Sequence, residues 1–513
     1  MNKKTLKVIS LFLCLFLMFS ICGCKDKPTE EEIYYEYEYE GGSSMNNVGN
    51  ESIESKNPNS PLSSENSSAA QGQADTSSVG QVPTNTTLPF TFEEYLHKSI
   101  TISIYDSSCT TYGFAWNSIG KPIKPVLKIS KGSTFNESNC KEYAVNVEMC
   151  ETYISETDTT YYYVSKAVVS GLEPNTEYSY QICDSVAKVY SVAATFKTAN
   201  PSDSSFTFLH FADSQVNGSK DGESLGKDTG IAFGNTLAAA TANCPSSAFM
   251  LHTGDIVEWS KYEGYWENML DFNKKYFNKY IFATISGNHE TTYRNGKNEI
   301  YKHFNIKTDS QTTTKGFYYY FDYGNARFIM LNTNDLTSDK KLKADQMAWL
   351  AEVLSNNPKK WTIVSMHNPL YSPGKYGDSP DWNSVCLALR NQLSNLFAEY
   401  NVDLVLQGHD HVYSRTHPID QNGNTIPNAP TNTVNGVTYY TNPGGTIYAM
   451  HGTSGTQTRG VVGNYTAAHY SYTKTSLTNS WAEISVDNEK LTVKVFSAEK
   501  GSADLIYSYG IMK

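Results

Sequence analysis

The pattern of apolar and polar positions divides the chain into regions with different periodicities. Residues 8–22 are almost continuously apolar, whereas the stretch that follows, to about residue 88, is polar and poor in large aliphatic side chains. From about residue 98 to residue 198, short runs with apolar residues at alternate positions recur, which is typical of β-strands. After Pro201, apolar runs of strand length alternate with helical stretches. We therefore expect a leader, a polar arm, an all-β domain and a mixed α/β domain.

These changes in pattern set the boundaries of the regions. The polar arm cannot bury enough apolar surface to offset its ordering entropy, so we expect a disordered tether. The Tyr/Glu alternation of residues 30–40 leaves a strand as the alternative there. Residues 437–450 and 481–495 alternate like strands and are expected to complete a second sheet. In chain order, the regions are a leader over 1–24, the tether over 25–94, the all-β domain over 95–200 and the mixed domain over 201–513.

The leader has the layout of an export signal. Three lysines precede the apolar run, which is shorter than the roughly 20 residues that a membrane span needs. The run ends in Ile-Cys-Gly-Cys at residues 21–24, which resembles a bacterial lipobox. The resemblance implies that Cys24 becomes the lipidated N-terminus. The protein would then be exported and anchored on the outer face of the bacterial cytoplasmic membrane.

A turn sequence near the end of the all-β region indicates a β-sandwich. Residues 171–178 read Gly-Leu-Glu-Pro-Asn-Thr-Glu-Tyr, which is similar to the turn into a late strand of a fibronectin-type domain. In such domains the hydroxyl of the Tyr, here Tyr178, bonds back to the preceding corner. The resemblance implies a fibronectin III-like sandwich of about 100 residues that acts as a platform for the mixed domain.

Side chains with metal-ligating chemistry follow the apolar runs of the mixed domain. Carboxylate, amide and imidazole groups are the donors that hold pairs of hard-to-borderline metal ions. Because α/β sheets build their sites at the carboxyl ends of strands, we expect these groups to meet. The five stretches are, in chain order, Asp213-Ser214-Gln215, Gly254-Asp255, Gly287-Asn288-His289-Glu290, His367 and Gly408-His409-Asp410-His411.

Taken together, these motifs resemble those of the metallophosphoesterases with calcineurin-like catalytic domains. Within that family the purple acid phosphatases are the most similar, because their catalytic domain follows a fibronectin-like sandwich. The resemblance implies an α/β (α+β) sandwich of two mixed sheets flanked by helices. It also implies that His289 faces the substrate and protonates or stabilises the leaving oxygen. The implied metal ligands are Asp213 and His411 for a first metal, Asp255 as the bridge, and Asn288, His367 and His409 for a second metal.

Elementary chemistry supports the same reaction type. Two metal ions about 3.5–4 Å apart need an anionic bridge, which a carboxylate such as Asp255 supplies. Their shared charge lowers the pKa of water, so that hydroxide is present near neutral pH and attacks phosphorus. An alkoxide leaving group then needs a proton, which an imidazole supplies. Iron, manganese and zinc remain alternatives for the two metals.

Two positions depart from the family pattern at the first metal. Gln215 stands where many relatives have His, and Glu258 stands where purple acid phosphatases have the Tyr that binds ferric iron. Either side chain can be a ligand or can hold ligands from behind by hydrogen bonds, and we expect the latter. Glu290 is likewise expected to orient a neighbouring ligand. Tyr413 and Arg415 are weaker candidates for phosphate contacts, with packed and surface positions as the alternatives.

Charge and cysteine content narrow the function further. The net charge is −11 and no basic stripe occurs, so we expect no nucleic-acid binding. The six cysteines between residues 109 and 386 lack the close pairing of a zinc knuckle. Disulfides formed after export and buried free thiols are both consistent with their spacing.

These features predict an exported, membrane-anchored enzyme that hydrolyses small phosphate monoesters, like an acid phosphatase, with hydroxide activated by two metals. A phosphodiesterase that acts on nucleotides or wall polymers is the alternative, because the same centre serves both reactions. A surface-binding lipoprotein without catalysis is a third interpretation, against which the complete ligand set of the second metal argues.

Overall fold

The computed structural model describes residues 91, 93–106, 109–154, 158–217, 225–291, 299–310, 315–377, 384–463 and 465–513. The expected leader and nearly all of the expected tether lie outside these residues. Within the described ranges, no helix is both long enough and apolar enough to span a bilayer.

The all-β domain consists of two sheets packed face to face. Phe114 of the first sheet meets Tyr180 and Phe196 of the second, with ring centroids 5.1 and 5.5 Å apart. The expected corner is present, because the Tyr178 hydroxyl accepts a hydrogen bond of 2.9 Å from the backbone N–H of Glu173. The first sheet contains β1 (Lys98–Ile104), β2 (Tyr112–Ser118), β5 (Asn146–Tyr153) and β6 (Thr159–Val169). The second contains β3 (Pro125–Lys131), β4 (Lys141–Tyr143), β7 (Glu177–Asp184), β8 (Val189–Tyr190) and β9 (Ala194–Lys197).

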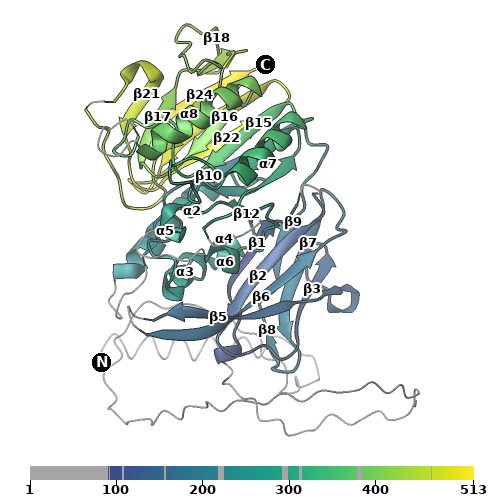
Figure 1. The fold of residues 1–513 in the computed structure, drawn as a ribbon. Coiled ribbons are helices and arrows are strands. Elements are labelled where there is room, and N and C mark those ends of the chain that lie inside the picture. Colours follow the sequence, from purple (N-terminus) through teal and green to yellow (C-terminus); the bar gives the residue numbers. More distant parts are fainter. Residues whose placement is uncertain are drawn as a thin grey trace, which may run out of the picture.

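The first of these sheets continues into the mixed domain without a break. Strand β1 pairs in parallel with β12, with Ile102 opposite Ile281, and Figure 1 shows the two strands side by side where the domains meet. The result is one twelve-stranded sheet in the order β18-β19-β24-β23-β22-β10-β11-β12-β1-β2-β6-β5. Its further strands are β10 (Phe206–Phe211), β11 (Met250–His252), β12 (Ile281–Thr284), β18 (Thr431–Val434), β19 (Val437–Thr441), β22 (Ser480–Val486), β23 (Lys490–Ser497) and β24 (Asp504–Met512).

A seven-stranded sheet forms the other layer of the mixed domain. Its central strands β14, β15, β16 and β20 run parallel, so their carboxyl ends lie at one edge. The order is β13-β14-β15-β16-β20-β17-β21. The strands are β13 (Tyr319–Tyr323), β14 (Ala326–Met330), β15 (Trp361–Met366), β16 (Leu404–Gln407), β17 (Val412–Thr416), β20 (Ile447–His451) and β21 (Tyr470–Thr475).

Aromatic side chains fill the space between the two layers. Phe208 of β10 and Phe249 both pack against Phe328 of β14, with ring centroids 5.1 and 5.2 Å apart. Helices α7 and α8 cover the outer face of the seven-stranded sheet, where Leu350 and Leu389 join its apolar cluster (Figure 1). The helices are α2 (Leu225–Asn243), α3 (Glu263–Leu270), α4 (Lys274–Phe277), α5 (Asn288–Thr291), α6 (Ile300–His303), α7 (Ala344–Ser355) and α8 (Ser384–Glu399).

This architecture confirms the predicted fold of two mixed sheets flanked by helices. The C-terminal strands differ from expectation, because they do not all join the second sheet. Strand β20 does, but β19 and β22–β24 extend the first sheet, where β22 pairs antiparallel with β10. An alternating strand pattern predicts a covered and an open face but does not identify the neighbouring strand.

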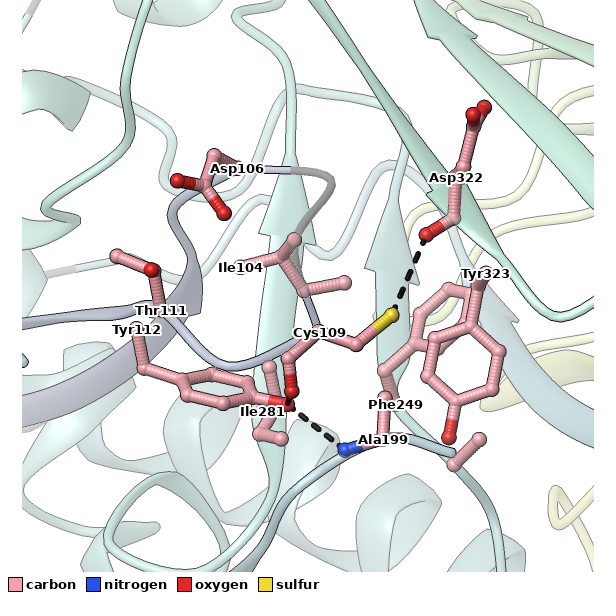
Figure 2. Close-up of a pocket in the computed structure, with 11 residues that line it drawn as sticks. Ile104, Asp106, Cys109, Thr111, Tyr112, Ala199, Phe249, Ile281, Asp322 and Tyr323 are labelled. Carbon is pink, nitrogen blue, oxygen red and sulfur yellow. Dashed lines mark hydrogen bonds between the residues drawn. The ribbon is translucent and has the colours of Figure 1, made fainter. Parts of the chain in front are cut away.

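The six cysteines of the described residues are free thiols, of which four are buried and two, Cys140 and Cys244, are half-buried. Cys109 lies in a small pocket at the junction of the two domains, where its thiol faces the Asp322 carbonyl (Figure 2). Burial raises the pKa of Cys109 to about 11, so the thiol stays protonated and unreactive at neutral pH. None of the expected site residues lines this pocket.

Candidate metal centre

The expected site residues lie in loops that leave the carboxyl ends of strands from both sheets. β10 leads to Asp213, β11 to Asp255, β12 to Asn288, β15 to His367 and β16 to His409. The backbones of Asp213, Asp255 and His409 adopt left-handed conformations, with φ of 52°, 54° and 75°. Such conformations cost of order 1–3 kcal/mol for residues other than glycine and persist where the surroundings impose them. The loops are therefore bent sharply in a way that brings the polar groups together.

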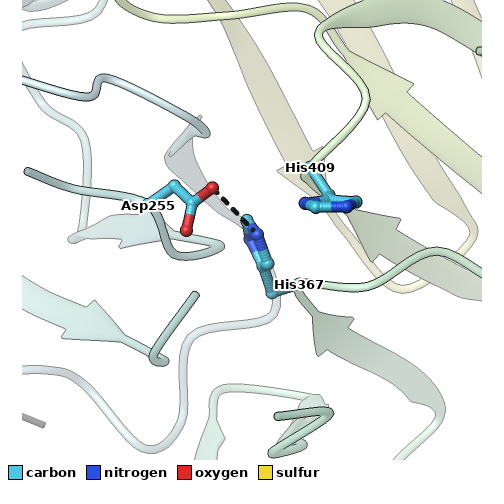
Figure 3. Close-up of side chains that lie close together, drawn as sticks. All are labelled: Asp255, His367 and His409. Carbon is cyan, nitrogen blue, oxygen red and sulfur yellow. Dashed lines mark ion pairs between the residues drawn. The ribbon is translucent and has the colours of Figure 1, made fainter. Parts of the chain in front are cut away.

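One half of the site is a tight cluster around Asp255. Ligand atoms of Asp255, His367 and His409 all lie within 4.8 Å of one another (Figure 3). The Asp255 Oδ2 atom lies 3.1 Å from His367 Nε2, and Asn288 Oδ1 lies 3.0 Å from the same nitrogen. All four residues implied for the second metal and its bridge thus converge on one point.

The other half of the site pairs Asp213 with His411. Their Oδ1 and Nε2 atoms are 3.5 Å apart, and both side chains are buried. The backbone N–H of His409 donates to both carboxylate oxygens of Asp213, at 2.9 and 3.1 Å. This contact joins the two halves, because His409 itself belongs to the Asp255 cluster.

The imidazoles present unshared electron pairs to the interior of the site. His367 Nδ1 faces the Thr253 carbonyl at 2.9 Å, and His411 Nδ1 faces the Gln457 carbonyl. Because a carbonyl can only accept, the Nδ1 atom of each ring donates its hydrogen there, and the Nε2 atom of each ring faces a carboxylate. Among the described residues, His409 Nδ1, His411 Nε2 and Gln215 Oε1 are buried and have no hydrogen-bond partner. Buried polar atoms without partners are costly, and bound cations would satisfy the imidazole nitrogens that carry unshared electron pairs.

The pKa of His367 reflects the same need for positive charge. Burial by itself lowers this pKa, but the carboxylates of Asp255 and Asp213 raise it to about 9. A proton on His367 thus neutralises Asp255 when no other cation is present. Metal binding at such ligands releases protons, so a metal ion takes the place of that proton.

Glu290 holds the two most important loops together. Its buried carboxylate accepts backbone hydrogen bonds from Gly287 at 2.8 Å, from Asp255 at 2.9 Å, and from Ile256 and Val257 at 2.8 and 3.2 Å. The expected orienting role of Glu290 agrees with this geometry. One side chain therefore positions both the Asp255 loop and the start of α5, which carries Asn288.

His289 lies beside the cluster with Gln215 and Glu258. Its Nε2 atom is 2.9 Å from Gln215 Nε2 and 3.7 Å from Asp255 Oδ2, and its Nδ1 atom is 2.8 Å from the Glu258 carbonyl. The Glu258 carboxylate accepts a hydrogen bond of 3.1 Å from Gln457 Nε2. Burial lowers the pKa of His289, but the negative charges of Asp255 and Glu258 outweigh it and raise this pKa above its ordinary value.

The weaker candidates lie away from the cluster. Tyr413 is buried and its hydroxyl pairs with Ser480 at 2.6 Å, while the Arg415 guanidinium stacks over Tyr509 at 4.5 Å. Sequence reasoning instead missed Arg459, whose Nη1 atom donates to the His409 carbonyl at 3.1 Å. No motif surrounds Arg459, and it follows His409 by 50 residues, so only the folded chain reveals the contact.

Comparison with known proteins identifies two domains of the chain. Residues 206–413 match the calcineurin-like phosphoesterase family, and residues 98–198 match the N-terminal domain of purple acid phosphatases. The chain therefore carries a calcineurin-like phosphoesterase domain preceded by a purple acid phosphatase N-terminal domain.

Individual relatives agree with this assignment. The chain is 25% identical over 299 residues to the uncharacterized protein Rv2577 of Mycobacterium tuberculosis, and the matched region covers 54% of this chain and 55% of the relative. It is 25% identical over 289 residues to purple acid phosphatase 23 of Arabidopsis thaliana, covering 50% and 58%. The chain thus spans little more than half the length of these relatives.

A solved structure shares the fold. The purple acid phosphatase PPD1 from yellow lupin seeds superposes with a TM-score of 0.64 over 81% of this chain and 74% of that protein, at 18% identity. The calcineurin-like phosphoesterase domain implies a dinuclear metal centre, and the donor set described above fits one. The set comprises two carboxylates, the Asn288 amide and three imidazoles, of which His409 Nδ1 and His411 Nε2 have no hydrogen-bond partner among the described residues.

We expect Glu290→Gln to weaken metal binding by about 10–100-fold while the protein stays folded. The substitution replaces one carboxylate oxygen by an NH₂ group, which would then face backbone N–H groups that now donate to that oxygen. Metal content after dialysis against a weak chelator, measured by elemental analysis, tests this. Glu483→Gln on β22 is the matched control, since this half-buried carboxylate bonds the Asn243 side chain far from the ligands. Equal metal retention in the two variants would contradict the role of Glu290.

Proposed function

We propose that this protein hydrolyses small phosphate monoesters, as an acid phosphatase does. The observation that carries the proposal is the convergence of Asp255, His367, His409 and Asn288 on one point within a calcineurin-like phosphoesterase domain. Two bound metal ions would supply an activated water nucleophile and positive charge for the phosphoryl oxygens. Asp213 and His411 would hold the first ion, Asn288, His367 and His409 the second, and Asp255 would bridge them.

The surrounding residues prepare the site for this chemistry. Thr253 and Gln457 carbonyls fix the ring orientations of His367 and His411, and Glu290 fixes the backbone at Asp255. Ligands held in this way do not need to reorganise during the reaction, which is the main source of electrostatic catalysis. Gln215 and Glu258 lie beside His289 rather than between the carboxylates, which supports a role behind the ligands.

His289 has the features of a general acid. Its pKa is raised by Asp255 and Glu258, which favours the protonated ring that an acid needs. The Gln215 side chain can pair with either protonation state of the His289 ring. Its Nε2 atom donates to an unprotonated His289 Nε2, and rotation of the amide by half a turn presents Oε1 to a protonated one. We therefore assign His289 to protonation of the leaving oxygen.

We expect Asp255→Asn and Asn288→Ala each to lower the hydrolysis of an aryl phosphate by at least about 1,000-fold, because each removes a ligand at the centre of the site. Circular dichroism should show that both variants stay folded. Asp504→Asn, a half-buried carboxylate on β24, is the control that keeps full activity. An active Asp255→Asn protein would rule out the proposed role of Asp255 at the metals, and a wild type without tightly bound metal would rule out the proposed reaction and favour a non-catalytic surface protein.

We expect His289→Ala to distinguish substrates by their leaving groups. Loss of the proton donor should lower kcat for an alkyl phosphate by about 100-fold or more, and kcat for a nitrophenyl phosphate much less, because nitrophenolate leaves without a proton. The ratio of the two kcat values in variant and wild type is the measurement. An equal fall for both esters would assign His289 to metal binding or folding instead.

We further propose that the protein is exported and anchored by a lipid on Cys24, which the lipobox-like sequence supports. In the bacterium that produces the protein, Cys24→Ser should move it from the membrane fraction to the medium or to a soluble fraction. Fractionation followed by immunoblotting tests this. A variant that stays with the membrane would show that another feature retains the protein.

A further inference from the structure

The loop after β20 is tied to the metal-ligand segments on two sides. The Gln457 carbonyl receives the Nδ1–H of His411, and the Arg459 N–H donates to the His411 carbonyl at 3.3 Å. On the other side, Val462 N–H donates to the Pro373 carbonyl at 2.9 Å. Arg459 is thus held against the ligands by backbone contacts rather than carried on a free loop.

The side chain of Arg459 forms a stack with Tyr376 and His409. Its guanidinium lies over the Tyr376 ring at 5.1 Å, and that ring lies 4.3 Å from the His409 ring. Its one hydrogen bond to the described residues goes from Nη1 to the His409 carbonyl. No carboxylate of the described residues lies within ion-pair distance of Arg459. A guanidinium has five N–H donors, so the described residues leave most of its donor capacity unused.

Arg459 lies on the open side of the site. Asp213, Asp255, His367 and His411 are buried, whereas the ligands Asn288 and His409 are half-buried and so mark the side that solvent reaches. The stack of Arg459 and Tyr376 adjoins His409, and both of these residues are half-buried as well. The guanidinium therefore lies beside the solvent-accessible edge of the ligand cluster.

We propose that Arg459 binds the non-bridging oxygens of the substrate phosphoryl group and selects monoester dianions over diesters, with Tyr376 positioning its guanidinium. This inference rests on the proposed function. A monoester presents three non-bridging oxygens and two negative charges, whereas a diester presents two such oxygens and one charge. The planar fork of a guanidinium matches paired phosphate oxygens and forms strong, charge-assisted hydrogen bonds.

The test compares Arg459→Ala, Arg459→Gln and Arg459→Lys in the full-length protein loaded with Mn²⁺. We expect the alanine and glutamine variants to bind inorganic phosphate about 10–100-fold more weakly in calorimetric titrations, with a similar fall in kcat/KM for an aryl monoester. The loss for an aryl diester should stay below about threefold, and the lysine variant should recover part of the monoester activity. Tyr376→Ala should lower phosphate affinity, and Tyr376→Phe, which keeps the ring, should restore it.

Lys375→Ala is the matched control. This lysine is exposed and lies next to Tyr376 in the chain, so its loss removes a nearby charge without removing the stacked guanidinium. Its phosphate affinity should stay within about twofold of the wild type, as expected for a screened surface charge.

Three results would overturn the inference: unchanged phosphate affinity in Arg459→Ala, an equal loss for monoester and diester, or a fall in metal content, which would assign Arg459 to holding His409. Failure of the proposed function is distinguishable from these. A wild type that binds Mn²⁺ and phosphate but hydrolyses neither ester would contradict the proposed function, while the phosphate titrations would still decide the role of Arg459.

Discussion

The burial of two carboxylates at the edge where two sheets meet is the constraint on which the site depends. Asp213 and Asp255 are each about 1% exposed, and a buried negative charge is costly unless positive charge compensates it. The protein supplies four imidazoles around them, of which His367 has a pKa raised to about 9 by those carboxylates. Cationic partners are therefore required by the structure itself, and the dinuclear metal centre that the calcineurin-like phosphoesterase domain implies would supply them.

The rest of the fold holds these charges in place. Left-handed backbone at Asp213, Asp255 and His409 brings the ends of strands from two sheets within reach of one another. The four N–H groups that Glu290 accepts fix the Asp255 loop to the start of α5. The parallel pairing of β1 with β12 places the all-β domain directly against the strand that leads to Asn288. The N-terminal domain is thus part of the framework of the site as well as a platform.

The sequence predicts the parts of this arrangement that follow from local pattern. Apolar runs that end in Asp213, Asp255, Asn288, His367 and His409 indicate strand ends, and the carboxyl ends of parallel strands meet at one edge. The corner at Tyr178 is local as well, since its hydroxyl bonds a residue five positions earlier. Features that depend on long-range packing were not predictable. The pairing of β1 with β12 joins residues about 180 positions apart, and nothing in the alternation of either strand identifies its neighbour.

The two halves of the site differ in chemistry, and this difference bears on the metals. The residues implied for the second metal match the family pattern in full. The half implied for the first metal consists of Asp213 and His411, with the neutral Gln215 amide nearby. Glu258 stands where a ferric site has a phenolate, and its carboxylate bonds the Gln457 side chain instead. Two carboxylates balance the charge of two divalent ions more closely than that of a ferric and a divalent ion. Imidazole, amide and carboxylate donors suit Mn²⁺, Zn²⁺ and Fe²⁺. The donor set therefore fits a dinuclear centre of any of these three metals.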